Sequence, residues 1–170
     1  IVFNSSVLKT LINAEQAPLC IVSDQNWLEY WSARMDDPLE DAETFKIDNG
    51  YITELGKKPK SAEEIQSQYI GLQRWSKAHI AEILSFYQDM DQNAVYDTKP
   101  FPQMYMTSFI QALIDNGFKA RNVTINNGWL ELDTVDDYKL YELMGQNGTL
   151  DKFYDSHEKL FRDVKPSKAG

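Results

Sequence analysis

The stretch TFKIDNGYITELG, residues 44–56, constrains the fold of this chain more than any other. Apolar and polar residues alternate in two short runs, and Asn49-Gly50 joins them. Alternation is typical of strands, and two-residue hairpin turns prefer Asn-Gly because both residues tolerate a positive φ. The sequence therefore predicts an antiparallel hairpin with strands at 44–48 and 51–56.

Strands and helices alternate along the rest of the chain. Further strands are predicted at 18–23, 69–75, 121–125 and 129–132. Apolar residues at helical spacing predict helices at 1–13, 26–35, 77–90, 104–117, 135–145 and 150–161. In the helix at 77–90, the residues expected to face inward are Ile80, Ile83, Leu84 and Tyr87. Ser61 and Glu64 have the form of a capping box for one more short helix. This interleaving predicts an α/β fold whose hairpin projects from a mainly parallel or mixed sheet.

Size and charge limit the classes of partner. With 170 residues, 42% of them hydrophobic, the chain suits one domain with a substantial core. A net charge of -9 disfavours nucleic acid, because an acidic surface repels phosphate backbones. The cluster of Lys57, Lys58 and Lys60 is too short to reverse this, but it is sufficient to hold one phosphorylated small molecule.

The sequence contains no recognisable membrane span or signal peptide. No apolar run approaches the roughly 18 residues of a spanning helix, and no basic region followed by an apolar core opens the chain. The single cysteine, Cys20, cannot form an internal disulfide, which favours a reducing compartment. A cytoplasmic protein without membrane partners is therefore expected.

Most common catalytic signatures are missing from the sequence. It contains no P-loop, no dinucleotide-binding glycine motif and no nucleophile elbow. His79 and His157 lie on predicted helices without the spacing of metal ligands. The sequence therefore predicts neither a catalytic triad nor a zinc site.

An acid pair is the strongest remaining chemical signal. Glu131 and Asp133 stand two residues apart in a predicted strand, so both side chains should project from one face. Magnesium prefers oxygen ligands and is usually held by one or two carboxylates together with substrate phosphates and water. The alternative is that both acids are solvated, or that Asp133 or Thr134 caps the following helix.

The surrounding residues carry a family resemblance. The stretch GWLELDTVDDYKLYE (128–142) resembles the closing motif of the nucleotidyltransferases that activate sugar phosphates and phosphocholine. Earlier stretches are similar to a phosphocholine cytidylyltransferase-like bacterial branch, in this order: IVFNSSVLKTLINA, VSDQNWLEYWSARMDDPLEDAETFKI, ITELGKKPK, QYIGLQRWS and MYMTSFIQALIDNG. The resemblance covers nearly the whole chain. It implies a Rossmann-like mixed sheet flanked by helices, of the nucleotide-diphospho-sugar transferase type.

Two parts of that family's nucleotide site are absent from the sequence. The glycine-rich loop that grips the nucleoside triphosphate is missing, and the family places its first metal aspartate just before a segment like IVFN. The chain begins at Ile1 without methionine, so the N-terminal part is expected to be missing. Residues 1–170 would then be a single-domain fragment, the C-terminal, acceptor-binding half of the enzyme, and inactive by itself.

The resemblance also implies a reaction. An acceptor phosphate oxygen would attack the α-phosphorus of a nucleoside triphosphate, expected to be CTP, and pyrophosphate would leave. The acceptor would be phosphocholine, a phosphonate or a sugar phosphate, and the sequence does not decide among them. Asp133 would be the second magnesium ligand, and Lys58 would help to neutralise charge, because positioning and neutralisation carry such reactions.

Further residues are implied to contact the substrates. Lys57, beside Lys58, would touch phosphate, although a solvated turn before Pro59 explains both lysines equally well. Gly71 interrupts a strand, as glycines do where a ligand approaches the backbone. Trp75, Trp129 and Glu131 adjoin these motifs, and an aromatic face with nearby acids suits a quaternary ammonium. Glu131 has a structural role as its alternative.

The sequence leaves a second class of function open. A non-catalytic binding or assembly module could keep the nucleotidyltransferase fold without turning over. A homo-oligomer is also compatible with the sequence, because a fragment of the sheet should leave apolar surface for a second copy or another segment to cover.

Overall fold

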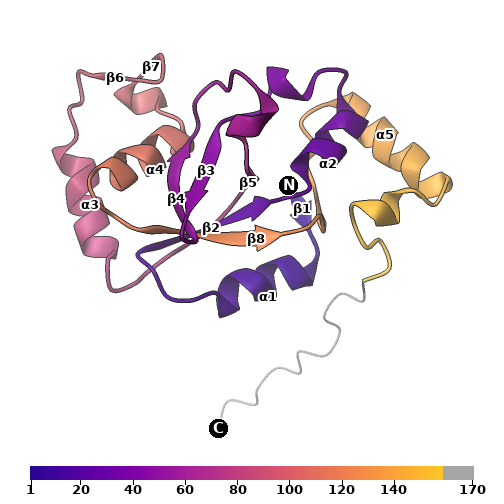
Figure 1. Ribbon diagram of the computed structural model, residues 1–170, viewed down its shortest axis with the longest axis horizontal. Coiled ribbons are helices and arrows are strands. Elements are labelled where there is room, and N and C mark those ends of the chain that lie inside the picture. Colours follow the sequence, from indigo (N-terminus) through magenta and orange to yellow (C-terminus); the bar gives the residue numbers. More distant parts are fainter. Residues whose placement is uncertain (159–170) are drawn as a thin grey trace, which may run out of the picture.

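The computed structural model describes residues 1–158 and centres on a mixed sheet (Figure 1). Five strands lie in the order β3-β4-β8-β2-β5. Their bounds are Leu19–Asp24 for β2, Phe45–Asp48 for β3, Tyr51–Leu55 for β4, Gln68–Trp75 for β5 and Ala120–Ile125 for β8. β2 and β8 run parallel and the other neighbours run antiparallel. The α/β mixed sheet is confirmed, but it is not mainly parallel.

Helices gather at both ends of this sheet and along one side of it. The helices are α1 (Ser5–Asn13), α2 (Trp27–Arg34), α3 (Ile80–Asp89), α4 (Met106–Asp115) and α5 (Val135–Gln146). In Figure 1, α3 and α4 lie at one end and α2 and α5 at the other. No helix within residues 1–158 has the length and apolarity needed to cross a membrane.

Several short elements complete the chain. Two-residue strands form β1 (Val2–Phe3) with β9 (Trp129–Leu130), and β6 (Val95–Tyr96) with β7 (Lys99–Pro100). Short 3₁₀ helices cover Pro38–Glu40, Ala62–Glu64, Phe101–Gln103 and Leu150–Lys152. All six predicted strands are present, with ends that differ by at most two residues.

The predicted hairpin is confirmed as β3 and β4. Asn49 and Gly50 both have positive φ, 49° and 80°, as the predicted turn requires. The hairpin does not project from the sheet, however. Tyr51 pairs with Arg121 of β8, and the Asn122 N–H donates to the Gly50 carbonyl at 3.0 Å. The hairpin therefore forms one edge of the sheet.

Polar side chains fix the alignment of the three strands β5, β2 and β8. Ser67 Oγ donates to Ser23 Oγ at 2.7 Å, and Ser23 Oγ donates to Asn122 Oδ1 at 2.6 Å. Ser23 and Ser67 are buried, so a one-residue slip would leave their hydroxyls without partners. This row of polar contacts selects the register next to the ends of β2 and β8.

Three helix predictions are wrong in part. Residues 1–13 begin with β1, because Val2 and Phe3 pair with β9, and the helix starts only at Ser5. Ser61 makes no side-chain capping hydrogen bond: the Glu64 N–H donates to the Ser61 carbonyl, and the Glu64 carboxylate accepts from the Lys60 N–H. The helix predicted at 150–161 is a 3₁₀ turn at Leu150–Lys152, and its last residues, 159–161, lie outside the described residues.

The predicted inward face of α3 is also wrong in part. Ile83 is buried, but Ile80, Leu84 and Tyr87 are exposed. With Trp75 and Phe109 they line an apolar groove of about 240 Å³. We refer to these six residues as the α3 groove.

Candidate active site

The candidate site lies where the parallel strands end. β2 ends at Asp24 and β8 ends at Ile125, and the Gln25 N–H donates to the Ile125 carbonyl at 3.0 Å. Open α/β sheets bind ligands outside the carboxyl ends of such strands. After β8, a turn at Asn127-Gly128 with positive φ and the short β9 lead the chain to Glu131 and Asp133.

Asp24 ties this edge together. Its Oδ1 accepts from the N–H groups of Asn26 (2.9 Å) and Asn127 (3.0 Å). Its Oδ2 accepts from Nε1 of Trp129 at 2.8 Å. Asp24 is fully buried, so these three donors supply the hydrogen bonds that water cannot.

Trp129 belongs to the core rather than to an open surface. Only 1% of it is exposed, and its ring lies 5.2 Å from the ring of Tyr30 and 5.7 Å from that of Trp31. Trp27 joins the same cluster, 6.1 Å from Trp31. The expectation that Trp129 presents a face to the acceptor therefore has no support in its position.

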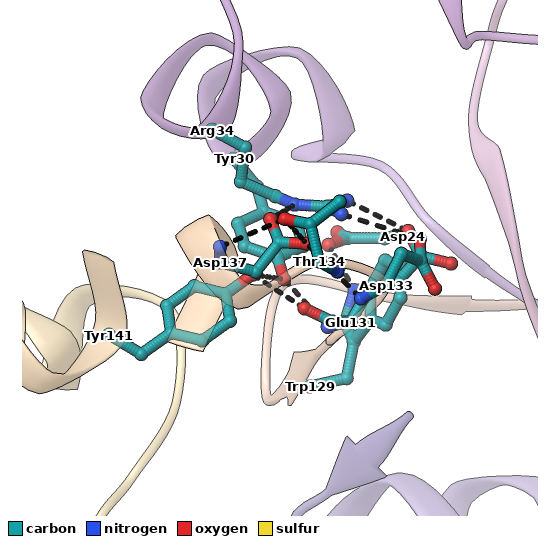
Figure 2. A network of polar contacts seen from close by, with 9 residues as sticks. All are labelled: Asp24, Tyr30, Arg34, Trp129, Glu131, Asp133, Thr134, Asp137 and Tyr141. Carbon is teal, nitrogen blue, oxygen red and sulfur yellow. Dashed lines mark hydrogen bonds and ion pairs between the residues drawn. The ribbon is translucent and has the colours of Figure 1, made fainter. Parts of the chain in front are cut away.

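Arg34, at the end of α2, forms ion pairs with three carboxylates (Figure 2). Its Nη1 lies 2.8 Å from Glu131 Oε2, its Nε 3.1 Å from Asp137 Oδ1, and its Nη2 3.5 Å from Asp133 Oδ2. The Arg34 side chain is only 4% exposed. We call these four residues the Arg34 group.

Two tyrosines hold the backbone of Glu131. The Glu131 N–H donates to the Tyr30 hydroxyl and the Tyr141 hydroxyl donates to the Glu131 carbonyl, both at 2.8 Å. The two hydroxyls are 2.6 Å apart. The segment after β9 is therefore held by hydrogen bonds to both α2 and α5.

Asp133 remains the most accessible acid of the Arg34 group. It does not cap α5, because Thr134 is the N-cap and forms a capping box with Asp137. The Asp133 N–H donates to Asp137 Oδ2 at 3.1 Å, while its own carboxylate is 61% exposed. That carboxylate therefore has free oxygen lone pairs facing solvent.

Burial and pairing shift the pKa values in this group in different directions. Burial raises the pKa of the Glu131 carboxyl, and the hydrogen bond from Arg34 only partly offsets the rise. Burial would also raise the pKa of Asp137, but hydrogen bonds from Arg34 and Thr134 lower it overall. Burial lowers the pKa of Arg34, yet hydrogen bonds to Asp137 and Glu131 outweigh it, so Arg34 stays charged.

Lys57 and Lys58 line a separate pocket of about 540 Å³. Lys58 Nζ donates to the carbonyls of Leu39 and Glu40, both at 2.6 Å, and Lys57 Nζ donates to Glu54 Oε2 at 2.9 Å. The same pocket is lined by Asp41, Glu43, Asp97 and Tyr105. We call it the lysine pocket.

Asp41 lines the lysine pocket, and its charge also affects Glu131 of the Arg34 group. Burial is the main reason why the pKa values of Glu43 and Glu131 are raised, and the charge of Asp41 adds to both shifts.

Trp75 lies apart from both places, whereas Gly71 lies near Ile1, which precedes the β1 residue Val2 that pairs with Leu130. Gly71 has φ +80° in an irregular part of β5, and a Cβ there would lie 3.9 Å from Ile1 Cδ1. Trp75 pairs with Leu19 at the opposite end of β2 from Asp24, and stacks on Phe109 at 6.1 Å. Of the predicted residues, the structure therefore brings together Glu131 with Asp133, and Lys57 with Lys58.

The sequence analysis missed Arg34 and both tyrosines of the site. Their signal is spacing: Tyr30 and Arg34 are four apart on α2, as are Asp137 and Tyr141 on α5. Residues four apart share one helix face, so each helix presents a phenol and a charge side by side. Neither pair of residues indicates a site from the sequence alone, because only the folded chain brings the segment after β9 between the two helices.

The acids at this edge could supply some, but not all, of the ligands of a hard cation. No group of three His, Cys, Asp or Glu side chains suited to a metal ion occurs in residues 1–158. The exposed Asp133 carboxylate offers oxygen ligands of the kind that magnesium takes. Substrate phosphates and water would have to supply the remaining ligands.

Comparison with known proteins decides the family. No family model matches the chain. A curated relative, the CTP:phosphoglutamine cytidylyltransferase of Campylobacter jejuni, is 46% identical over 140 residues, which are 82% of this chain and 55% of the relative. The chain belongs to the nucleotidyltransferase family. This nucleotidyltransferase chain spans about half the length of the curated relative that it matches.

One solved structure shares the fold of this nucleotidyltransferase. The inositol-1-phosphate CTP transferase of T. maritima aligns with a TM-score of 0.57 and 17% identity, over 91% of this chain and 54% of that one. This likeness confirms the expected fold type. The nucleoside-diphosphate-sugar pyrophosphorylase of Vibrio cholerae RC9 aligns more weakly, with a TM-score of 0.46 and 14% identity over 82% and 49% of the two chains.

Proposed function

We propose that this chain is the acceptor-binding half of a cytidylyltransferase, which transfers CMP from CTP to a phosphorylated small molecule and releases pyrophosphate. One observation carries the proposal: Glu131 and Asp133 of the GWLELDT stretch lie beside the carboxyl ends of the parallel strands, where such folds bind ligands. The 46% identity to a CTP-dependent relative supports the same reaction.

The proposed reaction needs little proton chemistry. An oxygen of the acceptor phosphate attacks the α-phosphorus of CTP, the bond to the β-phosphate bridging oxygen breaks, and pyrophosphate leaves with that electron pair. Because the nucleophile is already an anion, no general base is required. The chain's task is to orient the two phosphate groups and to neutralise their repulsion.

Asp133 is the residue proposed to hold a magnesium ion, which would supply charge neutralisation between the phosphates. Asp24 closes the central strand, but it is fully buried and its oxygens accept from Asn26, Asn127 and Trp129, so its role is to hold this edge of the sheet. Glu131, anchored to Arg34, is better suited to orienting Asp133 than to binding the ion.

We place the acceptor in the lysine pocket. Lys57 is 54% exposed at its rim and is the lysine best placed to meet a phosphate. Lys58 is held by two backbone carbonyls, so its role is to fix the pocket wall unless these bonds exchange for phosphate oxygens. Asp41, Glu43 and Tyr105 suit an acceptor with a cationic group, such as phosphocholine. A phosphonate or a sugar phosphate remains an alternative acceptor.

The proposal includes a cytoplasmic location and a homo-oligomeric state. Cys20 is buried and unpaired, which fits a cytoplasmic protein. The α3 groove offers an apolar surface to a second copy, which fits a homo-oligomer.

A substrate screen of the intact gene product tests the function. Each nucleoside triphosphate is paired with phosphocholine, a phosphonate and several sugar phosphates, with magnesium present, and pyrophosphate release is measured. We expect release with CTP and one acceptor class. Acceptor binding without pyrophosphate release from any pair would instead favour a non-catalytic module that keeps the fold.

A further inference from the structure

We propose that Arg34 is a positioning residue: its guanidinium, anchored by Glu131 and Asp137, fixes the carboxylate of Asp133 in the orientation that receives a divalent cation. The inference rests on the proposed function and names a residue that no sequence motif indicated. It concerns how the Arg34 group is built rather than which residue binds the ion.

The burial of Arg34 shows that it acts through its neighbours. With 4% of its side chain exposed and all three contacts made to carboxylates, Arg34 has no free face for a substrate phosphate. It also lies 5.6 Å from the Tyr30 ring centroid and 5.7 Å from that of Trp31. Two aromatic rings and three acids therefore hold the guanidinium in one place.

The three contacts are graded in a way that suits this role. Arg34 is anchored by Glu131 and Asp137, whose side chains are 25% and 9% exposed and whose oxygens lie 2.8 and 3.1 Å away. Its contact with Asp133 is the longest, 3.5 Å, and Asp133 is the most exposed of the three acids. The arginine therefore aims Asp133 without occupying both of its oxygens.

The charge balance explains why a cation is needed at this position. Glu131 and Asp133 stand two residues apart, and a carboxylate oxygen of each lies within 3.5 Å of the same guanidinium. Without Arg34 the acids would turn away from each other to reduce repulsion. With it, one positive charge faces three negative ones, and the group still attracts a divalent ion.

Arginine is required rather than lysine because the contacts use three different nitrogens of one planar group. Nε, Nη1 and Nη2 each meet a different acid. A lysine ammonium is a single point on a flexible stem and cannot reproduce this fork. Arg34→Lys therefore removes the orientation and keeps the charge, which separates the two effects.

The test compares Arg34→Lys with Arg74→Lys in the intact gene product. Arg74 is the matched control, because its guanidinium is also fixed by several bonds, but to the carbonyls of Leu11, Ile12, Ala14 and Glu15. Binding of Mn²⁺ is measured by electron paramagnetic resonance, together with the thermal midpoint, the half-saturating Mg²⁺ concentration and the acceptor KM.

We expect Arg34→Lys to weaken Mn²⁺ binding about 10–100-fold, the usual effect of losing a residue that orients a metal ligand. The half-saturating Mg²⁺ concentration should rise in parallel, while the acceptor KM stays unchanged, because Arg34 does not face the acceptor. Arg74→Lys should lower the thermal midpoint only. In an Asp133→Asn background, Arg34→Lys should have no further effect on Mn²⁺ binding.

Unchanged Mn²⁺ affinity in folded Arg34→Lys would overturn the inference, as would an equal loss in Arg74→Lys. If Arg34→Lys does not fold, Asp137→Asn loosens one anchor of Arg34 and gives the same readout. The outcome is separable from the proposed function: a wild-type protein that binds Mn²⁺ but releases no pyrophosphate refutes the function alone.

Discussion

Glu131 and Asp133 show how strongly position separates two similar side chains. They lie two residues apart, yet the Glu131 carboxylate is 25% exposed and bonded to Arg34 at 2.8 Å, whereas Asp133 is 61% exposed with one contact at 3.5 Å. Through its ion pair with Arg34, Glu131 helps to hold α2 against β9. Asp133 contributes little to stability and is free for chemistry.

Replacing Asp133 should separate activity from stability. In the intact gene product, Asp133→Asn should lower pyrophosphate release by orders of magnitude, because a proposed metal ligand is lost. The thermal midpoint should stay nearly constant, since an exposed ion pair contributes at most about 1 kcal/mol. Asp136→Asn, an acid that is 88% exposed on α5, is the control and should keep normal activity. Normal activity in Asp133→Asn would end the metal-ligand proposal.

At the scale of elements, local sequence predicted the structure best where one dipeptide determines it. Asn49-Gly50 set the hairpin, and the buried run ending at Asp24 identified β2, because neither depends on distant contacts. The outward residues of α3 could not be predicted. Helical spacing shows that Ile80, Leu84 and Tyr87 are near one another, but not what packs on them.

The candidate site was predictable only in part for the same reason. The acid pair was visible in the sequence, because two residues of one segment form it. Arg34 lies 97 residues from Glu131, and Tyr30 lies 111 from Tyr141, so only the folded chain brings them together. The burial of Trp129 could not be predicted from its neighbours in sequence, because its hydrogen-bond partner Asp24 lies in a distant part of the chain.

The β3–β4 hairpin should carry a measurable acid sensitivity. Glu54 faces Lys46 across the strands, and hydrogen bonds from Lys46 and Lys57 lower the pKa of Glu54 to about 2. A lowered pKa stabilises the fold fully above the ordinary value of 4.5, and this stabilisation is lost as the pH falls towards 2. Glu54→Gln should therefore be less stable than the wild type at pH 6.

The difference between the two proteins should shrink steadily below pH 4.5 and vanish near pH 2. Urea unfolding at several pH values measures it, with Glu142→Gln, an exposed glutamate of α5, as the control. A gap between wild type and Glu54→Gln that does not depend on pH would contradict this account of the hairpin.

At the scale of the whole molecule, the Arg34 group and the α3 groove are at opposite ends of the sheet. The Arg34 group lies at the carboxyl ends of β2 and β8, whereas the α3 groove lies beside Trp75, which pairs with the start of β2. Leu84 is 53% exposed in this groove and Tyr87 is 40% exposed. A contiguous apolar face of this kind usually marks a contact surface.

The isolated 170-residue chain should therefore self-associate. Light scattering should give an average mass above 19.6 kDa that rises with concentration, because burying the α3 groove removes apolar surface from water. Leu84→Glu should return the mass towards that of one chain. A clean, stable monomer at all concentrations would show that this face needs no cover.

The placement of the tryptophans gives the molecule two separate optical reporters. Trp27, Trp31 and Trp129 pack within 6.1 Å of a neighbouring ring beneath the Arg34 group, and coupled indoles of this kind dominate near-ultraviolet circular dichroism. Trp75 stands apart from them, stacked on Phe109 in the α3 groove. Events at the acids should thus alter the dichroism of the cluster, while association through the groove should alter the emission of Trp75, so one sample can report both.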